Sequence, residues 1–175
     1  MKLTSKQVGD VGEHWVLYRL IREGYTAVLA PKNADAVDIL AADKHGLPFS
    51  IQVKTKTNAR GWRLDQKDES RSDPRLFYCL VDLGKNCDRE PPEGYVVPSR
   101  LASRFVKHAH AGWLGMTKAN GDPHKDSKMR VLEDSYGRLA SVIDMDEYPE
   151  GWLERYRENW SLLADLAKEE AGCAE

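Results

Sequence analysis

The chain has 175 residues, of which 41% are hydrophobic and 31% are charged, and its formal net charge is -2. This composition is typical of an ordinary globular protein and excludes fibrous and intrinsically disordered classes. Neither a signal-peptide h-region nor an apolar run of about 18 residues is present, so we expect a cytoplasmic protein that does not span a membrane. We expect one domain over residues 1–175, with a core at about 5–114 and a C-terminal extension at about 115–175.

The N-terminal segment has the pattern of a helix. Thr4 followed by Gln7 forms a capping-box pattern, and Gly24 stands where a helix commonly ends. We therefore expect a helix over residues 5–23. Loop and turn residues separate three following segments of strand character, which cover 25–30, 36–42 and 48–56.

The remainder of the chain alternates between polar segments and buried-strand or helical patterns. These patterns indicate an α/β protein. The expected elements are a short helix around 64–69, strands over 76–83 and 93–98, a helix over 99–114 capped by Ser99, a loop over 115–130, a hairpin or short strand pair over 131–144, and a terminal helix over 152–170.

The net charge is an average over an uneven distribution. Residues 51–75 carry three more basic than acidic side chains, residues 98–130 carry five more, and residues 131–175 carry eight more acidic than basic ones. Local potential governs polyanion binding, so the two basic stretches are compatible with a nucleic-acid partner. Solvated surface is the alternative interpretation of both stretches.

Cysteine and histidine spacings do not predict a zinc site. The three cysteines include no CxxC pair, and Cys79 lies in the apolar run FYCLVDL, where a buried reduced thiol is expected. His108, His110 and His124 lie two and fourteen residues apart without a nearby cysteine, so we interpret them as surface histidines.

One strand carries two polar residues on a single face. In PFSIQVKTK, apolar residues alternate with polar ones, which places Gln52 and Lys54 together. A turn near residues 45–46 would bring Asp38, on the preceding strand, beside them. Glu13 lies on the apolar stripe of the first helix, so helix packing would carry it inward.

Two carboxylates, a carboxamide and a lysine at one sheet edge can perform a specific reaction. Carboxylate and amide oxygens bind Mg²⁺ or Mn²⁺, while a lysine holds or deprotonates the attacking water and offsets phosphate charge. These groups suit the hydrolysis of a phosphodiester bond.

These residues resemble the motif of the PD-(D/E)XK nuclease superfamily, in its Q-x-K form. The resemblance rests on Glu13 in GEHWVLYRL, Asp38 in AVDIL and Gln52-Val53-Lys54 in IQVKTK, and it covers roughly residues 5–83. It implies a restriction-endonuclease-like α-β-β-β-α-β core with a central mixed sheet, followed by a C-terminal helical extension. It also implies that Glu13, Asp38, Gln52 and the Val53 carbonyl ligate the metal and that Lys54 is the catalytic lysine.

Position 52 departs from the commonest form of this motif. Gln52 replaces a second acidic residue, and a neutral carboxamide lowers the negative charge of the site and therefore its metal affinity. Asp35 is a rival aspartate, although its place beside Asn33 favours a turn.

Basic residues after the motif strand and in the second basic stretch are candidates for nucleic-acid binding. Trp62 could stack on a base, and core packing is its alternative role. The candidate set is Lys56, Arg60, Trp62, Arg63, Lys125, Lys128 and Arg130.

The sequence thus predicts a divalent-metal-dependent endonuclease acting on DNA. The alternatives are a catalytically inactive nucleic-acid-binding module of the same fold, or a protein-interaction domain that uses the acidic C-terminal third. A packing stripe or a homodimer contact is expected from the apolar residues at helical spacing near the C-terminus, which are Trp152, Tyr156, Trp160 and Leu163.

Overall fold

The first helix, α1, begins and ends as its sequence signals predict. The computed structural model describes residues 3–31, 37–85, 91–135, 140–141, 143–144 and 146–164. In it, α1 spans Ser5–Arg22, and Thr4 and Gln7 form both hydrogen bonds of a capping box. After the helix, Gly24 adopts a φ of +88°, which turns the chain toward the first strand.

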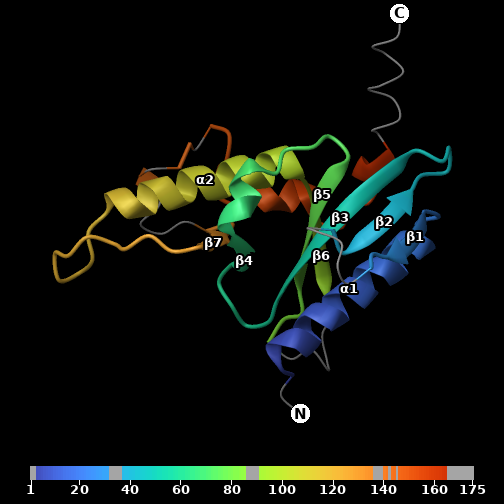
Figure 1. The fold of residues 1–175 in the computed structure, drawn as a ribbon, viewed down its shortest axis with the longest axis horizontal. Helices are drawn as coiled ribbons and strands as arrows, with labels where there is room; N and C mark the ends of the chain where they lie inside the picture. The colour runs from blue at the N-terminus through green and yellow to red at the C-terminus, as the bar shows by residue number, and fades with distance from the viewer. Residues whose placement is uncertain are drawn as a thin grey trace, which may run out of the picture.

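A mixed five-stranded sheet forms the centre of the molecule (Figure 1). Its order is β1-β2-β3-β5-β6, and every neighbouring pair is antiparallel except β3 and β5, which are parallel. The expected α/β fold with a central mixed sheet is therefore confirmed. The strands are β1 (Thr26–Leu29), β2 (Ile39–Ala42), β3 (Pro48–Lys56), β5 (Leu76–Asp82) and β6 (Glu93–Pro98).

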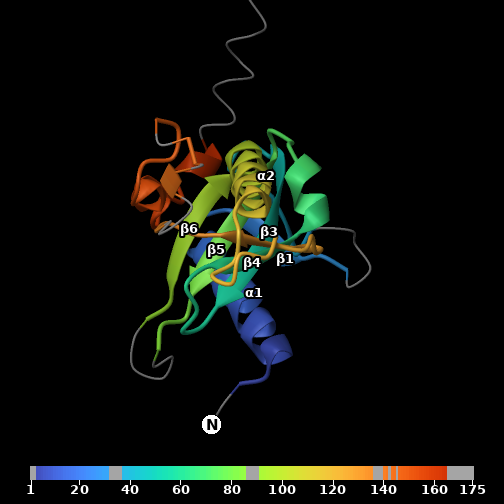
Figure 2. The ribbon, with the colours of Figure 1, turned by 90° about the vertical axis from the view of Figure 1, so that its left-hand side faces the viewer.

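Alternation along the strands gives the sheet two apolar faces. Ile51 and Val53 belong to one cluster, in which Val16 and Leu20 of α1 are buried. The opposite face packs against α2 (Ser99–Gly115), which contributes buried residues such as Phe105. The two views show α1 and α2 on opposite sides of the sheet (Figures 1 and 2). Both faces of β3 are consequently covered over part of its length.

A second, two-stranded sheet lies beside α2. It consists of β4 (Trp62–Asp65) and β7 (Met129–Leu132), which pair antiparallel, and the 3-10 helix η1 (Gln66–Ser70) follows β4. The sequence predicted a short helix around 64–69 and a loop over 115–130 at these places. Because the two strands are far apart in the chain, neither segment alone indicates the pairing. The expected strand pair within 131–144 does not form in its described residues, and β7 pairs with β4 instead.

The start of α2 differs from the expected Ser99 cap. Pro98 occupies the N-cap position, and the Ser99 hydroxyl instead accepts from the Asp73 backbone nitrogen and donates to the Asp73 carbonyl. Ser99 therefore ties α2 to the chain before β5 rather than capping the helix.

The expected continuous helix over 152–170 is wrong in the described residues. A 3-10 helix, η3, spans Trp152–Tyr156, Arg157 after it is extended, and Glu158 has a φ of +50°. Contacts with β6 interrupt the helix, since the Glu158 side chain accepts a hydrogen bond from the Gly94 nitrogen and its backbone nitrogen donates to the Gly94 carbonyl.

The predicted apolar stripe nevertheless packs onto the core. Trp152, Trp160 and Leu163 are buried, Trp152 in the cluster with α2 and the other two in the cluster with α1. Cys79 is also buried, as expected for a reduced thiol. Cys87, Cys173 and Asp35 lie outside the described residues. No helix in the described part of the chain is long and apolar enough to cross a bilayer.

Candidate active site

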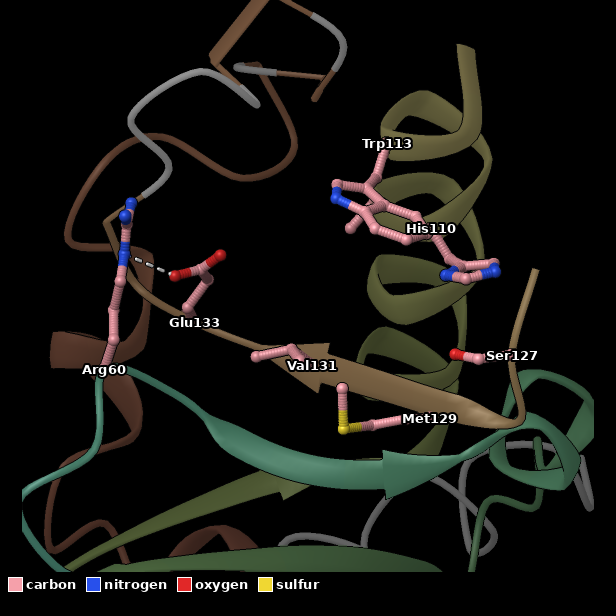
Figure 3. Close-up of a pocket in the computed structure, with 8 residues that line it drawn as sticks. Arg60, His110, Trp113, Ser127, Met129, Val131 and Glu133 are labelled. Carbon is pink, nitrogen blue, oxygen red and sulfur yellow. Dashed lines mark ion pairs between the residues drawn. The ribbon is translucent and has the colours of Figure 1, made fainter. Parts of the chain in front are cut away.

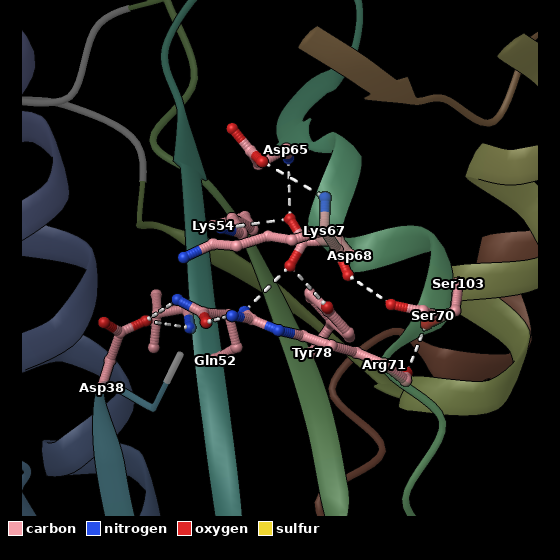
Figure 4. Close-up of polar contacts among 11 residues, drawn as sticks. Asp38, Gln52, Lys54, Asp65, Lys67, Asp68, Ser70, Arg71, Tyr78 and Ser103 are labelled. Carbon is pink, nitrogen blue, oxygen red and sulfur yellow. Dashed lines mark hydrogen bonds and ion pairs between the residues drawn. The ribbon is translucent and has the colours of Figure 1, made fainter. Parts of the chain in front are cut away.

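Asp38 lies immediately before β2, at the point where that strand meets β3. Its backbone nitrogen donates to the Ile51 carbonyl, which fixes the residue against the neighbouring strand. Its side-chain Oδ2 accepts two hydrogen bonds, from Gln52 Nε2 at 2.6 Å and from the Val53 backbone nitrogen at 2.7 Å (Figure 4). The structure thus brings Asp38 and Gln52 together, as the strand pattern predicted.

Gln52 and Lys54 project from the same face of β3 toward η1 (Figure 4). Gln52 is only 8% exposed, and its Oε1 accepts a hydrogen bond from Arg71 Nη1 at 3.2 Å. Lys54 Nζ lies 3.7 Å from Asp68 Oδ2, and the Lys54 side chain is partly exposed. The lysine is therefore held by a carboxylate while it remains accessible to a ligand.

Asp68 is a buried carboxylate at the centre of this polar network. It is 0% exposed, and its Oδ1 accepts from Tyr78 OH at 2.9 Å and from Arg71 Nη1 at 3.0 Å. Its Oδ2 accepts from the Asp65 backbone nitrogen and faces Lys54. Burial of a carboxylate is costly without such partners, so the network accounts for the presence of Asp68 in the core.

Glu13 approaches from α1, which packs closely on β3 through Gly12. A Cβ at position 12 would overlap the Thr55 hydroxyl, so glycine permits the helix to lie against the strand. The pKa of Glu13 is raised, first by burial and then by the negative charge of Asp38. The negative charges of the two carboxylates therefore disfavour one another at this edge of the sheet.

The oxygen donors around this edge are of the kind that a hard divalent cation takes. Among the described residues, no group of three or more histidine, cysteine, aspartate or glutamate side chains is close enough together to hold a metal. Two carboxylates with a backbone carbonyl and water are sufficient for Mg²⁺, which keeps several waters in many protein sites. Glu13, Asp38 and the Val53 carbonyl are the groups of this chain that could hold it, and Gln52 lies beside them.

Most of the predicted nucleic-acid-binding residues lie at the surface. Arg63, Lys125 and Lys128 are exposed, whereas Lys56 is partly buried over the Trp62 ring and pairs with Asp82 at 3.1 Å. Arg60 is exposed but pairs with Glu133 at 2.7 Å. Arg63, Lys125 and Lys128 are therefore the candidates most open to a polyanion.

Two of the predicted nucleic-acid contacts, Trp62 and Arg130, are buried side chains. Trp62 is 3% exposed, and its Nε1 donates to the Val81 carbonyl at 2.8 Å, so the ring packs the core and cannot stack on a base. Arg130 is also 3% exposed and pairs with Glu69, because alternation on β7 directs it inward toward η1. Both residues stabilise the β4–β7 sheet.

A separate recess lies between α2 and β7 and has a volume of about 310 Å³ (Figure 3). Met129, Val131 and Trp113 supply much of its wall, and none of the residues around Asp38 lines it. His110 stacks beside Trp113, and its Nε2 lies 2.7 Å from Asp126 Oδ1. His110 is therefore half-buried, whereas the sequence predicted a surface histidine. Polar side chains also line the recess, among them Ser127 and the ion pair of Arg60 with Glu133.

Sequence reasoning missed Asp68, Arg71 and Tyr78. The local sequence contained one signal, since Asp65 and Asp68 form a capping box at the start of η1. The contacts of Asp68 with Lys54 and Tyr78 depend on the parallel pairing of β3 with β5, which no local pattern indicates.

Comparison with known proteins supports the fold. No family model matches the chain, and no curated protein matches it in sequence. The fold is similar to the solved structure of a bacterial homing endonuclease, I-Ssp6803I, with a TM-score of 0.54 and 13% sequence identity over 98% of this chain and 100% of that one. At this identity the similarity shows a common fold alone.

Proposed function

We propose that this protein is a divalent-metal-dependent endonuclease that hydrolyses phosphodiester bonds in DNA, with a PD-(D/E)XK-type site in its Q-x-K form. The observation that carries the proposal is the convergence of Asp38, Gln52 and Lys54 at one edge of β3, with Glu13 close enough to Asp38 for their charges to interact. The similarity in fold to a homing endonuclease is consistent with this activity.

Each residue has a distinct role in the proposed reaction. Glu13 and Asp38, with the Val53 carbonyl, would hold Mg²⁺ or Mn²⁺, and Gln52 completes the set of side chains at this edge. The cation would supply Lewis-acid activation of the phosphate and of the attacking water. Lys54 would orient that water and offset the charge that develops on the phosphate, while the ion pair with Asp68 holds its ammonium group in place.

A catalytically inactive nucleic-acid-binding module is the second candidate. It is favoured by one observation, the neutral Gln52 at the position of a second acid, because the site then contains fewer negative charges to attract a cation. This candidate predicts salt-dependent binding of nucleic acid without metal-dependent turnover.

The acidic C-terminal third is less suited to binding a protein partner. Several of its carboxylates already pair with arginines of this chain, including Glu133 with Arg60 and Glu158 with Arg19. Those charges stabilise contacts within the fold, so we do not propose this region as the main functional surface.

Cleavage of supercoiled plasmid in Mg²⁺ or Mn²⁺ tests the proposal, with a structured RNA as a parallel substrate. We expect the wild-type protein to nick or linearise the plasmid and Asp38→Asn and Lys54→Met to lower the rate on the order of a hundredfold or more. Lys44→Met, in an exposed turn, serves as the control for loss of a lysine. Equal rates for the wild type and both site variants would reject catalysis, and metal-independent binding would then identify the binding module.

A further inference from the structure

Gln52 is oriented with its nitrogen, rather than its oxygen, toward Asp38. We propose that Gln52 is a positioning residue instead of a metal ligand: Arg71 holds its carbonyl oxygen, and its NH₂ group fixes Asp38 so that Asp38 Oδ1 faces the cation. The part of this inference that concerns the cation rests on the proposed function. The orientation of the amide can be tested without metal.

The chemistry of the three side chains permits a single order of hydrogen bonds. A guanidinium can only donate and a carboxylate can only accept, whereas a carboxamide does both. Arg71 Nη1 lies 3.2 Å from Gln52 Oε1, and Gln52 Nε2 lies 2.6 Å from Asp38 Oδ2. A reversed amide would place its NH₂ group against the guanidinium and its oxygen against the carboxylate, so both contacts would become repulsive.

This order also explains why position 52 is occupied by glutamine. A glutamate at this position could pair with Arg71, but it would bring a second negative charge to within hydrogen-bonding distance of Asp38. The carboxamide instead adds a donor to the one already supplied by the Val53 backbone nitrogen, and both donors converge on Oδ2. The protein thereby fixes Oδ2, and the proposal assigns Oδ1 to the ligand.

Arg71 can impose this orientation because it is itself held on two sides. Its Nη1 donates to the fully buried Asp68, which also accepts from Tyr78. Its backbone carbonyl accepts a hydrogen bond from the Ser103 hydroxyl on α2. The side chains drawn in Figure 4 thus connect α2 and η1 to Asp38. Such outer contacts commonly orient the groups that bind a metal.

Selective ¹⁵N labelling of glutamine tests the orientation in metal-free protein. The chain has only three glutamines, Gln7, Gln52 and Gln66, so the side-chain NH₂ signals are few and Gln52→Met assigns the one of interest. We expect the Gln52 pair to be protected from solvent exchange in the wild type and to lose this protection in Arg71→Met. Arg104→Met, which removes a surface pair with Glu147, is the matched control and should leave the pair unchanged.

Circular dichroism and thermal unfolding of each variant report whether it is folded. If Arg71→Met does not fold, Arg71→Lys is used, since it keeps a positive charge beside Asp68 but is too short to hold both partners. Retained protection of the Gln52 amide in the folded Arg71 variant would overturn the proposal.

Saturating Mg²⁺ separates the positioning role from direct ligation. A positioning residue keeps its protected NH₂ pair when the metal binds, whereas a ligand must turn its oxygen to the ion and lose that protection; the second result would overturn the inference. In cleavage assays we expect Gln52→Met and Arg71→Met each to lower kcat about tenfold, and the double variant to be no slower than the slower single variant.

If the reduction of kcat in the double variant equals the product of the two single reductions, the two residues act independently, and the proposal is contradicted. If the wild type cleaves no substrate, the proposed function fails, while the amide signals in metal-free protein still decide whether Arg71 orients Gln52.

Discussion

Glu13 is a site residue whose ionisation depends on its surroundings. Burial raises its pKa, the charges of Asp38 and Asp10 raise it further, and His14 and Lys6 lower it in part. The carboxylate form is therefore less favourable in the folded chain than in the unfolded chain. A bound cation would reverse this preference by stabilising the negative charge.

The stability of metal-free protein should therefore respond to Glu13→Gln in a pH-dependent way. Because the folded-state pKa is raised, the favourable contribution of protonated Glu13 is lost as the pH rises through that pKa. We expect the variant to melt at a higher temperature than the wild type at pH 7 and at about the same temperature near pH 4. Thermal unfolding in chelator over this pH range measures the difference, and a lower melting temperature for the variant at pH 7 would contradict the assignment.

Individual site residues were predictable where a local pattern determines their direction. Strand alternation placed Gln52 and Lys54 on one face, and the adjacent strand brought Asp38 to them. The same rule could not place Trp62 and Arg130, because the strands that direct both side chains inward form only when β4 meets β7. Basic or aromatic character alone was not sufficient to predict a surface contact.

At the level of elements, the seating of α1 on β3 positions Glu13. Gly12 lies directly against the Thr55 side chain, and Thr55 Oγ1 is a buried atom without a hydrogen-bond partner within the described part of the chain. Any side chain at position 12 must therefore push the helix from the strand or displace Thr55.

Two alanine substitutions in α1 provide a matched test of this seating. Gly9→Ala has open space around the added methyl group and should stabilise the fold by up to about 1 kcal/mol through helix propensity. Gly12→Ala should instead destabilise it by about 1–3 kcal/mol because of overpacking. Urea denaturation measures both changes, and equal stabilisation by the two substitutions would show that α1 does not pack on β3 in this way.

The elements with local signals were predicted well, and those that depend on distant partners were not. The predicted bounds of β3 and β6 agree with the structure to the residue, and α1 and α2 end within one residue of theirs. The β4–β7 sheet and the break at Arg157 were missed, because each is determined by contacts with residues far away in the sequence. Helical spacing of apolar residues near the C-terminus indicated burial correctly but not continuous helix.

Over the whole molecule, the acidic and basic regions differ in how far their charges are paired within the fold. Part of the acidic excess of the C-terminal third is paired with arginines of the core, whereas Lys125 and Lys128 remain exposed in the segment between α2 and β7. That segment extends beyond the end of α2 (Figure 1). It can therefore contact a polyanion despite the net charge of -2.

Replacement of both exposed lysines should weaken DNA binding through electrostatics alone. For Lys125→Ala with Lys128→Ala, we expect lower affinity for all sequences and a dependence of log K on log salt that is shallower by about one for each phosphate that is no longer neutralised. Fluorescence anisotropy across a salt series in Ca²⁺ measures the slope. Lys44→Ala with Lys85→Ala removes the same number of positive charges elsewhere and is the control. An equal change in slope for both double variants would show that the segment between α2 and β7 has no specific role in DNA binding.

The location of a bound cation is the most direct test of the proposed metal site. Crystals soaked in Mn²⁺ should show an anomalous peak between the carboxylates of Glu13 and Asp38, and the peak should be absent from crystals of Asp38→Asn treated in the same way. Saturating Mn²⁺ that leaves this position empty, or binds elsewhere in the molecule, would contradict a metal-dependent nuclease site at the edge of β3.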